Sequence, residues 1–470
     1  MKVEQLYTKC LAEATYFIAS NGEAAIIDPL RETAPYIAIA KENDVTIKYI
    51  FLTHFHADFV SGHVDLAKET GATIVYGPTA TADFDFHEGK DNEDFILGDV
   101  RLRLLHTPGH TLESSSFLLF DEFDKEYCLF SGDALFIGDV GRPDLAVSSS
   151  VTKEDLAGKL FHSLRDIIMK LPNDVIIYPN HGKGSACGKN MSSETFDTLG
   201  NQKKVNYALN PNLSKEEFVK QILDGLTEPP QYFPKNALMN KMVNTPIEKL
   251  LTKGLTPITA NQFQDYFALE DVLFLDVRSP KDFADKHIEN SIFIGLDGTF
   301  APWVGALIEN IKQPIVLITP EGREEETVTR LSRIGYDNVL GYIKGGVIAW
   351  ENEGLNVNKL LTLEANDIEL LDEDCSFLDV RRIGEYNQNC INNTKHLPLD
   401  DIYLSAKEED KNKERYVYCA GGYRSVIAIS ILNRLGFKNL ININGGFTEI
   451  IKSNIPLKVY KNSCTTSACS

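Results

Sequence analysis

Two histidines and an aspartate stand within five residues of one another, in the segment His54-Phe55-His56-Ala57-Asp58. They follow an apolar run over residues 49–52, which predicts a buried strand. Because alternate residues of an extended segment point the same way, we expect His54 and His56 to face one pocket. Imidazole and carboxylate groups are typical metal ligands, so the cluster indicates a metal site rather than exposed polar residues of a loop.

Three more residues of ligand type follow strand-like runs later in the chain: His110 after residues 100–105, Asp133 after 127–130 and His181 after 175–178. Repeated placement at strand ends indicates that a sheet must bring them to one pocket. Further strands are expected over residues 15–19, 24–27, 47–52 and 73–76, and helices over 63–70 and 153–171.

These separate motifs together resemble the metallo-β-lactamase superfamily over about the first half of the chain. The resemblance implies an αββα sandwich, in which two sheets are covered by helices on their outer faces. The family's usual first motif ends in a histidine that helps to hold a second metal, but Phe59 stands at that position. Phenylalanine has no lone pair to donate, so a dinuclear zinc site would lack one ligand, whereas a site for one metal is retained.

Within the superfamily the chain resembles the persulfide dioxygenase branch, and the run from Gly141 to Leu145 (Gly-Arg-Pro-Asp-Leu) supports this. The resemblance implies one Fe(II) per chain, held by His54, His110 and Asp133. Two imidazoles and one carboxylate with open positions suit non-haem iron and O₂ chemistry.

Other residues near these motifs receive weaker assignments. His56, Asp58 and His181 are expected to orient the metal ligands or to line the substrate pocket. Arg142 either binds a substrate carboxylate or forms a structural ion pair. Cys187, six residues after His181, either lies near the metal or is a buried packing residue, and packing is favoured.

The whole composition excludes some classes of protein. A formal net charge of −20 argues against nucleic acid as a partner. No segment approaches the about 18 apolar residues of a membrane span, and residues 1–6 show no apolar secretory signal. The eight cysteines are scattered, which predicts a reducing, cytoplasmic compartment.

The C-terminal half repeats itself. Residues 274–278 (Phe-Leu-Asp-Val-Arg) recur unchanged at 377–381, and 331–336 recur in similar form at 432–437. A repeat of about 100 residues with alternating strand-like and helical stretches predicts two copies of a doubly wound α/β domain. The expected boundaries are 1–245 for the iron domain with its C-terminal extension, 256–355 and 360–460 for the two copies, and 461–470 for a tail.

The second copy carries a loop suited to sulfur chemistry. Strand-like residues 416–418 lead into Cys419, followed by Ala420, Gly421, Gly422, Tyr423 and Arg424. Backbone amides converge in such a glycine-rich loop, and the following helix N-terminus favours a thiolate. The loop resembles that of rhodanese domains, in which the cysteine carries a sulfane sulfur as a persulfide. Four residues separate Cys419 from Arg424, whereas related phosphatases carry five, which favours sulfur transfer.

The first copy lacks this chemistry. Its equivalent loop runs from Thr319 to Glu324, and no cysteine lies between Cys187 and Cys375. The copy is therefore predicted to be inactive and to act as a spacer or docking domain.

The leading hypothesis is a bifunctional enzyme of sulfide detoxification. It oxidises a glutathione, coenzyme A or similar persulfide to sulfite with Fe(II) and O₂, and it forms or uses thiosulfate at Cys419. The alternatives are a zinc thioester hydrolase of the glyoxalase II type with an attached sulfurtransferase, and a sulfur carrier with a vestigial metal domain. The sequence leaves open the thiol carrier, the direction of transfer, a homo-oligomeric state and the role of Cys464 and Cys469.

Overall fold

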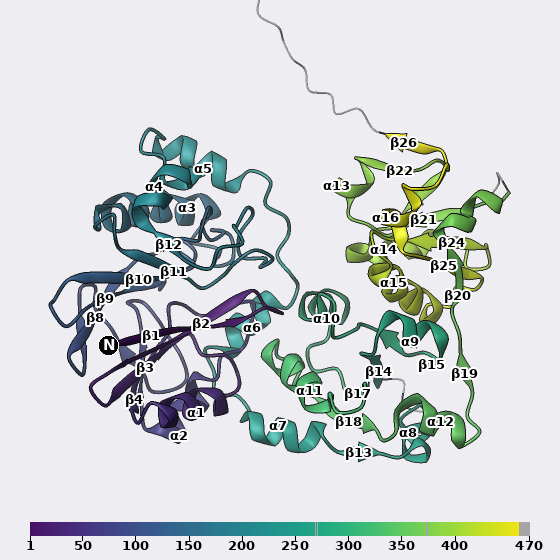
Figure 1. The fold of residues 1–470 in the computed structure, drawn as a ribbon, viewed down its shortest axis with the longest axis horizontal. Coiled ribbons are helices and arrows are strands. Elements are labelled where there is room, and N and C mark those ends of the chain that lie inside the picture. The colour runs from purple at the N-terminus through teal and green to yellow at the C-terminus, as the bar shows by residue number, and fades with distance from the viewer. Residues whose placement is uncertain (268, 270, 373–374, 460–470) are drawn as a thin grey trace, which may run out of the picture. The chain divides into compact units, whose positions relative to one another are not determined.

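The computed structural model describes residues 1–470 except 268, 270, 373–374 and 460–470 (Figure 1). Cys464 and Cys469 lie outside the described residues. The chain divides into two compact units, residues 1–250 with 329–337 and residues 251–328 with 338–470.

The N-terminal unit contains two six-stranded sheets, in the orders β1-β2-β3-β4-β5-β6 and β12-β11-β10-β9-β8-β7. The first consists of β1 (Lys2–Thr8), β2 (Glu13–Ser20), β3 (Glu23–Ile27), β4 (Thr46–Phe51), β5 (Thr73–Tyr76) and β6 (His87–Glu88). The second consists of β7 (Asp94–Leu97), β8 (Val100–His106), β9 (Ser115–Phe120), β10 (Glu126–Gly132), β11 (Ile176–Pro179) and β12 (Asp197–Thr198). The first and last residues of each strand expected from the sequence lie within two residues of those of an observed strand.

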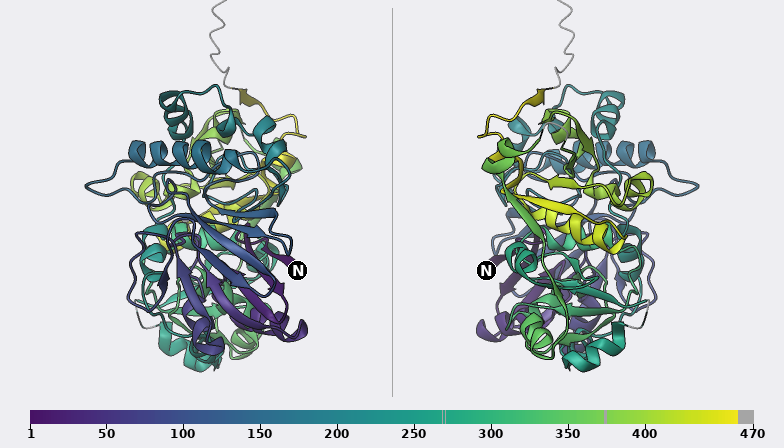
Figure 2. Two further views of the ribbon diagram at one scale, coloured as in Figure 1. Left: turned by 90° about the vertical axis from the view of Figure 1, so that its left-hand side faces the viewer. Right: turned by 90° about the vertical axis from the view of Figure 1, so that its right-hand side faces the viewer.

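Three apolar cores hold these sheets in layers. The two sheets bury a shared core that includes Tyr16, Phe51, Phe117 and Phe130. On the outer face of the first sheet, α1 (Ala34–Glu42) and α2 (His63–Thr70) contribute to a second core. On the outer face of the second sheet, α3 (Lys153–His162) and α5 (Lys215–Leu223) contribute to a third. The left view of Figure 2 faces this unit. The predicted αββα sandwich is therefore confirmed.

The helices differ from expectation in two places. Residues 153–171 form α3, then a π-helical turn (Ser163–Ile167) and a 3₁₀ turn (Ile168–Lys170), and they end before Pro172. From its sequence, the run Tyr232-Phe233-Pro234 suggests an extended aromatic segment, and that expectation is wrong. Tyr232 instead precedes α6 (Phe233–Met239), because proline is tolerated in the first turn of a helix. The other helices here are α4 (Leu199–Val205) and α7 (Ile247–Gly254).

The C-terminal half contains two five-stranded parallel sheets, in the orders β13-β18-β17-β14-β16 and β20-β25-β24-β21-β23. The first consists of β13 (Pro257–Ile258), β14 (Leu273–Asp276), β16 (Ile292–Phe293), β17 (Ile315–Ile318) and β18 (Val339–Ile343). The second consists of β20 (Leu361–Glu364), β21 (Phe377–Asp379), β23 (Thr394–His396), β24 (Arg415–Tyr418) and β25 (Leu440–Asn444). The matching strand orders confirm the duplication.

Helices and one small two-stranded sheet complete each copy. In the first copy they are α8 (Ala260–Phe267), α9 (Pro280–Asp285), α10 (Phe300–Leu307), α11 (Glu324–Arg333) and α12 (Gly346–Asn352). In the second they are α13 (Ile383–Tyr386), α14 (Ile402–Ser405), α15 (Tyr423–Arg434) and α16 (Gly446–Ile450). Two-stranded sheets join β15 (His287–Ile288) to β19 (Val357–Asn358), and β22 (Asn389–Ile391) to β26 (Leu457–Val459).

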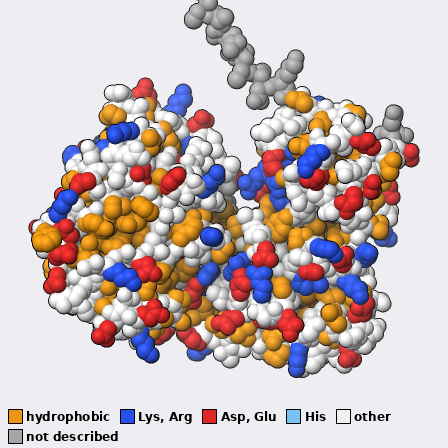
Figure 3. Space-filling view, viewed as in Figure 1, with side chains coloured by type: hydrophobic (Ala, Val, Ile, Leu, Met, Phe, Trp, Pro, Cys, Tyr) orange, Lys and Arg blue, Asp and Glu red, His pale blue; other side chains and the backbone are white. Residues whose placement is uncertain are grey.

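Acidic and basic side chains are scattered over the visible face of the molecule, without a continuous basic surface (Figure 3). Among the described residues, none of the helices combines the length and apolar character that a membrane crossing requires.

Candidate metal centre and sulfur-binding loop

Three buried side chains from distant parts of the N-terminal unit converge on one point. His54 lies just after β4, His110 lies between β8 and β9, and Asp133 follows β10 directly. Their nearest nitrogen and oxygen atoms all lie within 4.8 Å of one another, and His110 Nε2 lies 3.3 Å from Asp133 Oδ2. The three residues predicted to hold the metal are therefore brought together by the fold.

Hydrogen bonds fix which imidazole nitrogens face this point. Thr53 Oγ1 donates to Asp28 Oδ2 and lies 3.0 Å from His54 Nδ1, so it accepts the Nδ1 proton and leaves Nε2 with its lone pair. His110 Nδ1 donates to the carbonyl oxygen of Arg142 at 2.9 Å, which leaves its Nε2 free in the same way. Burial, and then the neighbouring imidazoles His56 and His110, lower the pKa of His54 well below its ordinary value. Both rings are thus held in the form that binds a metal.

The unsatisfied atoms of this pocket fit a cation. His54 Nε2 and both carboxylate oxygens of Asp133 are buried and have no hydrogen-bond partner among the described residues. Leaving such groups unpaired costs about 1–3 kcal/mol each, and more for a charged group. Metal coordination removes this cost, and two imidazoles with one carboxylate match a transition-metal ion. The chain therefore carries a metal-binding His/Asp site.

Asp28 is not among the site residues expected from the sequence, although Asp28-Pro29 at the end of a strand matches the superfamily pattern. Its Oδ1 accepts hydrogen bonds from the Thr53 amide at 2.8 Å and from His56 Nε2 at 2.9 Å. Burial acts to lower the pKa of His56, but the Asp28 carboxylate outweighs it, and the pKa is raised. His56 Nδ1 is left buried without a hydrogen-bond partner in the described structure. Asp28 follows β3 directly, and this shared position at a strand end was the available signal.

A second group of ligand-type side chains adjoins the first. Asp58, His181 and Cys187 are buried, with their potential ligand atoms within 4.8 Å of one another. His181 Nε2 lies 3.4 Å from Asp58 Oδ2 and 3.7 Å from Asp133 Oδ1, so the two groups share one pocket. Burial, and then the nearby carboxylates, raise the pKa of Cys187 well above its ordinary value. Cys187 is therefore a buried, protonated thiol at the edge of the metal pocket.

Phe59 packs against His56. Its ring stacks on His56, with ring centroids 4.3 Å apart, and it is fully buried. The position where the superfamily usually has a histidine thus presents a hydrocarbon surface to the pocket.

The segment around Arg142 supports the metal ligands. The guanidinium group of Arg142 donates to both carboxylate oxygens of Asp144, at 2.6 and 2.7 Å, and to the carbonyl of Thr227 at 2.5 Å. This geometry matches the structural ion pair rather than a free substrate-binding cation. A Cβ atom on Gly141 would lie 2.2 Å from the Asp133 carbonyl oxygen and 3.0 Å from His110 Nδ1. Glycine is therefore required for Asp133 and His110 to keep their places.

Cys419 lies between β24 and α15. Its Sγ accepts a hydrogen bond from the Gly422 amide at 3.1 Å, and the thiol lies 3.7 Å from Ser425 Oγ. The Cys419 carbonyl accepts from the Phe447 amide of α16 at 2.7 Å, which anchors the start of the loop to its own copy. One amide of the predicted glycine-rich loop thus faces the sulfur, at the N-terminus of a twelve-residue helix.

The equivalent loop of the first copy is organised differently. Thr319 follows β17 at the position that Cys419 holds after β24. Arg323 is engaged by two acidic residues, Glu326 and Asp297. This loop offers a hydroxyl and paired charges instead of a thiol.

Comparison with known proteins agrees with this architecture. The Metallo-beta-lactamase superfamily profile matches residues 9–181, and the Rhodanese-like domain profile matches residues 259–353 and 364–453. The chain belongs to the metallo-β-lactamase superfamily and carries two rhodanese-like domains after that fold.

The named relatives include a persulfide dioxygenase and a hydroxyacylglutathione hydrolase. Human "Persulfide dioxygenase ETHE1, mitochondrial" is 32% identical over 251 residues, which cover 52% of this chain and 90% of that protein. A "Probable hydroxyacylglutathione hydrolase" of Schizosaccharomyces pombe is 30% identical over 184 residues, covering 38% of this chain and 67% of that protein. A crystal structure of a metallo-beta-lactamase from Staphylococcus aureus is 33% identical with a TM-score of 0.65, covering 73% of this chain and 98% of that one. The chain is an enzyme.

Proposed function

We propose that this chain is a bifunctional sulfur enzyme. Its N-terminal unit oxidises a low-molecular-weight persulfide to sulfite with Fe(II) and O₂, and Cys419 transfers sulfane sulfur. The observation that supports this most is the convergence of His54, His110 and Asp133 beside Phe59, because it offers ligands for one metal of the non-haem iron type. The human relative named a persulfide dioxygenase supports the same substrate class.

The proposed oxidation is balanced as follows. The outer sulfur of the persulfide loses four electrons to O₂, receives both oxygen atoms of O₂ and one from water, and leaves as sulfite with release of two protons, while its S–S bond breaks and the carrier is released as a thiol. Bound Fe(II) would supply the O₂ chemistry. The chain's own part is to hold the two imidazoles through Thr53 and the Arg142 carbonyl, and to keep the pocket buried.

The proposed transfer uses the second rhodanese copy. The Cys419 thiolate attacks the sulfane sulfur of a persulfide, the donor S–S bond breaks, and the carrier leaves as a thiol. Sulfite then attacks the outer sulfur on Cys419, which releases thiosulfate and restores the thiolate. The Gly422 amide, 3.1 Å from Sγ, is placed to stabilise the negative sulfur.

The two reactions share one class of intermediate. Sulfite made in the first is consumed in the second, and fusion in one chain raises its effective concentration. Glutathione and coenzyme A persulfides fit the proposal equally, and the proposed role is detoxification of sulfide in the cytoplasm.

The test is O₂ uptake by iron-loaded protein supplied with glutathione persulfide, coenzyme A persulfide and inorganic polysulfide in turn. We expect uptake with at least one donor and one iron per chain. No uptake with any donor at full iron loading would refute the oxygenase. Cys419→Ser is expected to keep O₂ uptake and to abolish thiosulfate formation, and loss of both would contradict separate sites.

A second candidate is a zinc-dependent thioester hydrolase with an attached sulfurtransferase. The Asp58, His181 and Cys187 group and the hydroxyacylglutathione hydrolase relative favour it. Phe59 counts against it, because a ligand for the second metal is replaced by hydrocarbon. Two zinc ions per chain, with hydrolysis of S-lactoylglutathione, would favour this candidate over the dioxygenase.

A further inference from the structure

Tyr423, in the sulfur-binding loop of the second copy, contacts the cysteine-less first copy. Its hydroxyl donates a hydrogen bond to the carbonyl oxygen of Gly295, with Oη and O 2.8 Å apart. Its ring packs against Phe293 of β16, with ring centroids 5.9 Å apart at an interplanar angle of 71°. Burial, and then Asp297, raise the pKa of Tyr423, so the hydroxyl keeps the proton that it donates.

Gly298 completes the seat for this ring. A Cβ atom on Gly298 would lie 2.2 Å from Cζ of Tyr423 and 2.5 and 2.6 Å from two further ring atoms. Such distances are far below van der Waals contact, so any side chain at this position displaces the ring. The surface formed by Gly295 and Gly298, called the Tyr423 seat, therefore accommodates the tyrosine ring only as long as Gly298 has no side chain.

Two further contacts lie on the same face of α15. Ser430, seven residues after Tyr423, accepts a hydrogen bond from the Phe293 amide at 3.0 Å. Arg434, eleven residues after Tyr423, donates to the Asn290 carbonyl at 3.1 Å. Residues spaced by seven and eleven share one face of a helix. The first copy thus contacts α15 along its length, and of these three residues Tyr423 is the nearest to Cys419 in the sequence.

The two ends of the Cys419 loop are consequently anchored by two different rhodanese copies. Its start is anchored within the second copy, where the Ala420 carbonyl accepts from the Thr448 amide and hydroxyl, both at 2.9 Å. Its end is anchored at Tyr423 by the first copy. Gly422, whose amide bonds Cys419 Sγ, lies directly before Tyr423, so a shift of Tyr423 moves the amide that faces the sulfur.

We propose that the cysteine-less rhodanese copy positions the Cys419 loop of the active copy, by seating Tyr423 on Gly295 and Gly298. The inference rests on the proposed sulfur transfer at Cys419, and it gives the first copy a function beyond that of a spacer. Tyr423 and Gly298 are positioning residues, because they act on the sulfur through the Gly422 amide.

The test compares full-length wild type with Gly298→Ala and Tyr423→Phe. Gly384→Ala is the matched control, because no atom lies within 4 Å of the methyl group that it adds. Displacing a reacting group by about 1 Å costs about 10²-fold, so Gly298→Ala should lower kcat for sulfur transfer from thiosulfate to cyanide by about that factor. Tyr423→Phe loses one hydrogen bond and should lower kcat by about tenfold. Gly384→Ala should match wild type.

A second readout separates positioning from general damage. The rate at which iodoacetamide alkylates Cys419, followed on its peptide by mass spectrometry across pH, should shift in both variants and stay unchanged in the control. O₂ uptake with persulfide and the thermal unfolding profile should stay at wild-type values. Wild-type kcat together with a wild-type alkylation profile in Gly298→Ala would overturn the inference, as would the same result in Tyr423→Phe if Gly298→Ala does not fold.

The alkylation profile also distinguishes the two proposals. If wild-type protein takes no sulfur from thiosulfate or persulfide at Cys419, the proposed transfer fails. The positioning inference is then decided by the alkylation profiles alone, which do not require turnover.

Discussion

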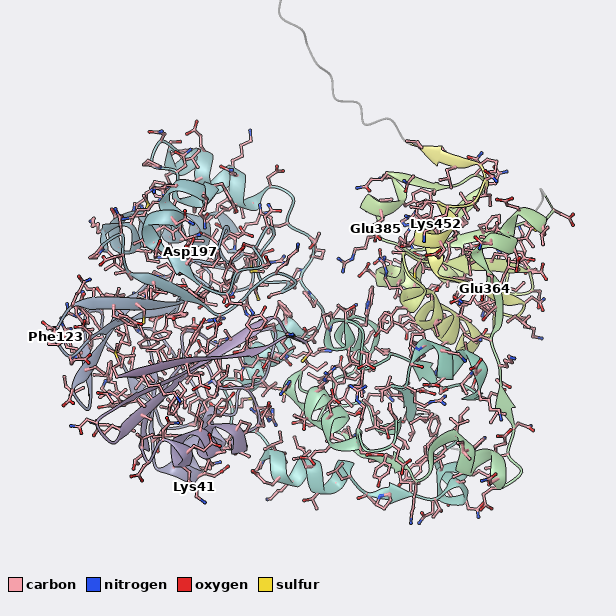
Figure 4. The ribbon with its side chains drawn as sticks, in the orientation of Figure 1. Lys41, Phe123, Asp197, Glu364, Glu385 and Lys452 are labelled. Carbon is pink, nitrogen blue, oxygen red and sulfur yellow. The ribbon has the colours of Figure 1, made fainter. Side chains whose placement is uncertain are left out.

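Arg424 and Glu385 form a two-armed ion pair beside the Cys419 loop: Nη1 lies 2.7 Å from Oε2, and Nη2 lies 2.7 Å from Oε1. Glu385 belongs to α13 of the same rhodanese copy and is labelled in Figure 4. The hydrogen bonds from Arg424 hold the pKa of Glu385 below its ordinary value, so the carboxylate stays charged and cancels the guanidinium charge. The one arginine of the loop is therefore already neutralised before a substrate arrives.

This pairing predicts how the loop selects its sulfur donor. Thiosulfate brings two negative charges to the sulfur that is transferred and gains from a free cation there, whereas the persulfide group itself carries one at most. Glu385→Gln removes the competing charge and should lower KM for thiosulfate by about tenfold, because a charge-assisted hydrogen bond contributes about 1.5–3 kcal/mol. Steady-state transfer to cyanide measures this effect. Glu449→Gln is the control, since Glu449 lies on α16 and its partner Lys452 is exposed, and an equal KM in the two variants would contradict the prediction.

Phe59 predicts the metal count of the N-terminal unit. Phe59→His restores an imidazole beside His56, which could join Asp58 and His181 as a ligand, and it should raise bound zinc from one to two ions per chain. O₂ uptake should fall in this variant, because the open positions become shared with the second metal. Elemental analysis after loading with zinc gives the count. Phe59→Leu, which offers no lone pair, is the control and should hold one.

Sequence patterns predicted the candidate metal ligands because each of them follows a strand-like run. The local sequence singled out His54, His110 and Asp133 together with other residues of ligand type, and the resemblance to the persulfide dioxygenase branch selected these three. The Tyr423–Gly298 contact could not, since it joins residues 125 positions apart and neither residue type is unusual. Arg142 shows another limit of prediction from sequence. Its partner Asp144 is only two residues away, but the structure was needed to decide between a substrate-binding arginine and an arginine in a structural ion pair.

Replacing Asp28 by asparagine should weaken metal binding strongly, although the side chain changes little in size. Asp28→Asn keeps the shape of the side chain but removes the charge that Thr53 and His56 are hydrogen-bonded to. Loss of such a supporting group typically costs 10–100-fold in metal affinity, and we expect a loss of about that size. Competition with a chromogenic chelator measures it. Asp197→Asn, a distant change on the second sheet (Asp197 is labelled in Figure 4), should leave the affinity at the wild-type value; equal affinities in both variants would exclude a role for Asp28.

Metal binding predicts a shift in thermal stability that needs no catalytic turnover. An ion that binds only the folded protein adds RT ln(1 + [L]/Kd), which is about 2.7 kcal/mol when the free ion stands at 100 times Kd. For a unit of this size, each kcal/mol raises Tm by about 2–4 °C, so anaerobic Fe(II) should raise the first unfolding transition by about 5–10 °C. Differential scanning calorimetry measures the shift.

Asp133→Asn keeps the volume of the side chain but removes the anionic ligand, and it should lose most of the shift. Cys187→Ala should keep the shift, because the thiol lies outside the group formed by His54, His110 and Asp133. The reverse pattern, with the shift lost in Cys187→Ala and kept in Asp133→Asn, would move the metal to the Asp58, His181 and Cys187 group and remove the basis for the dioxygenase.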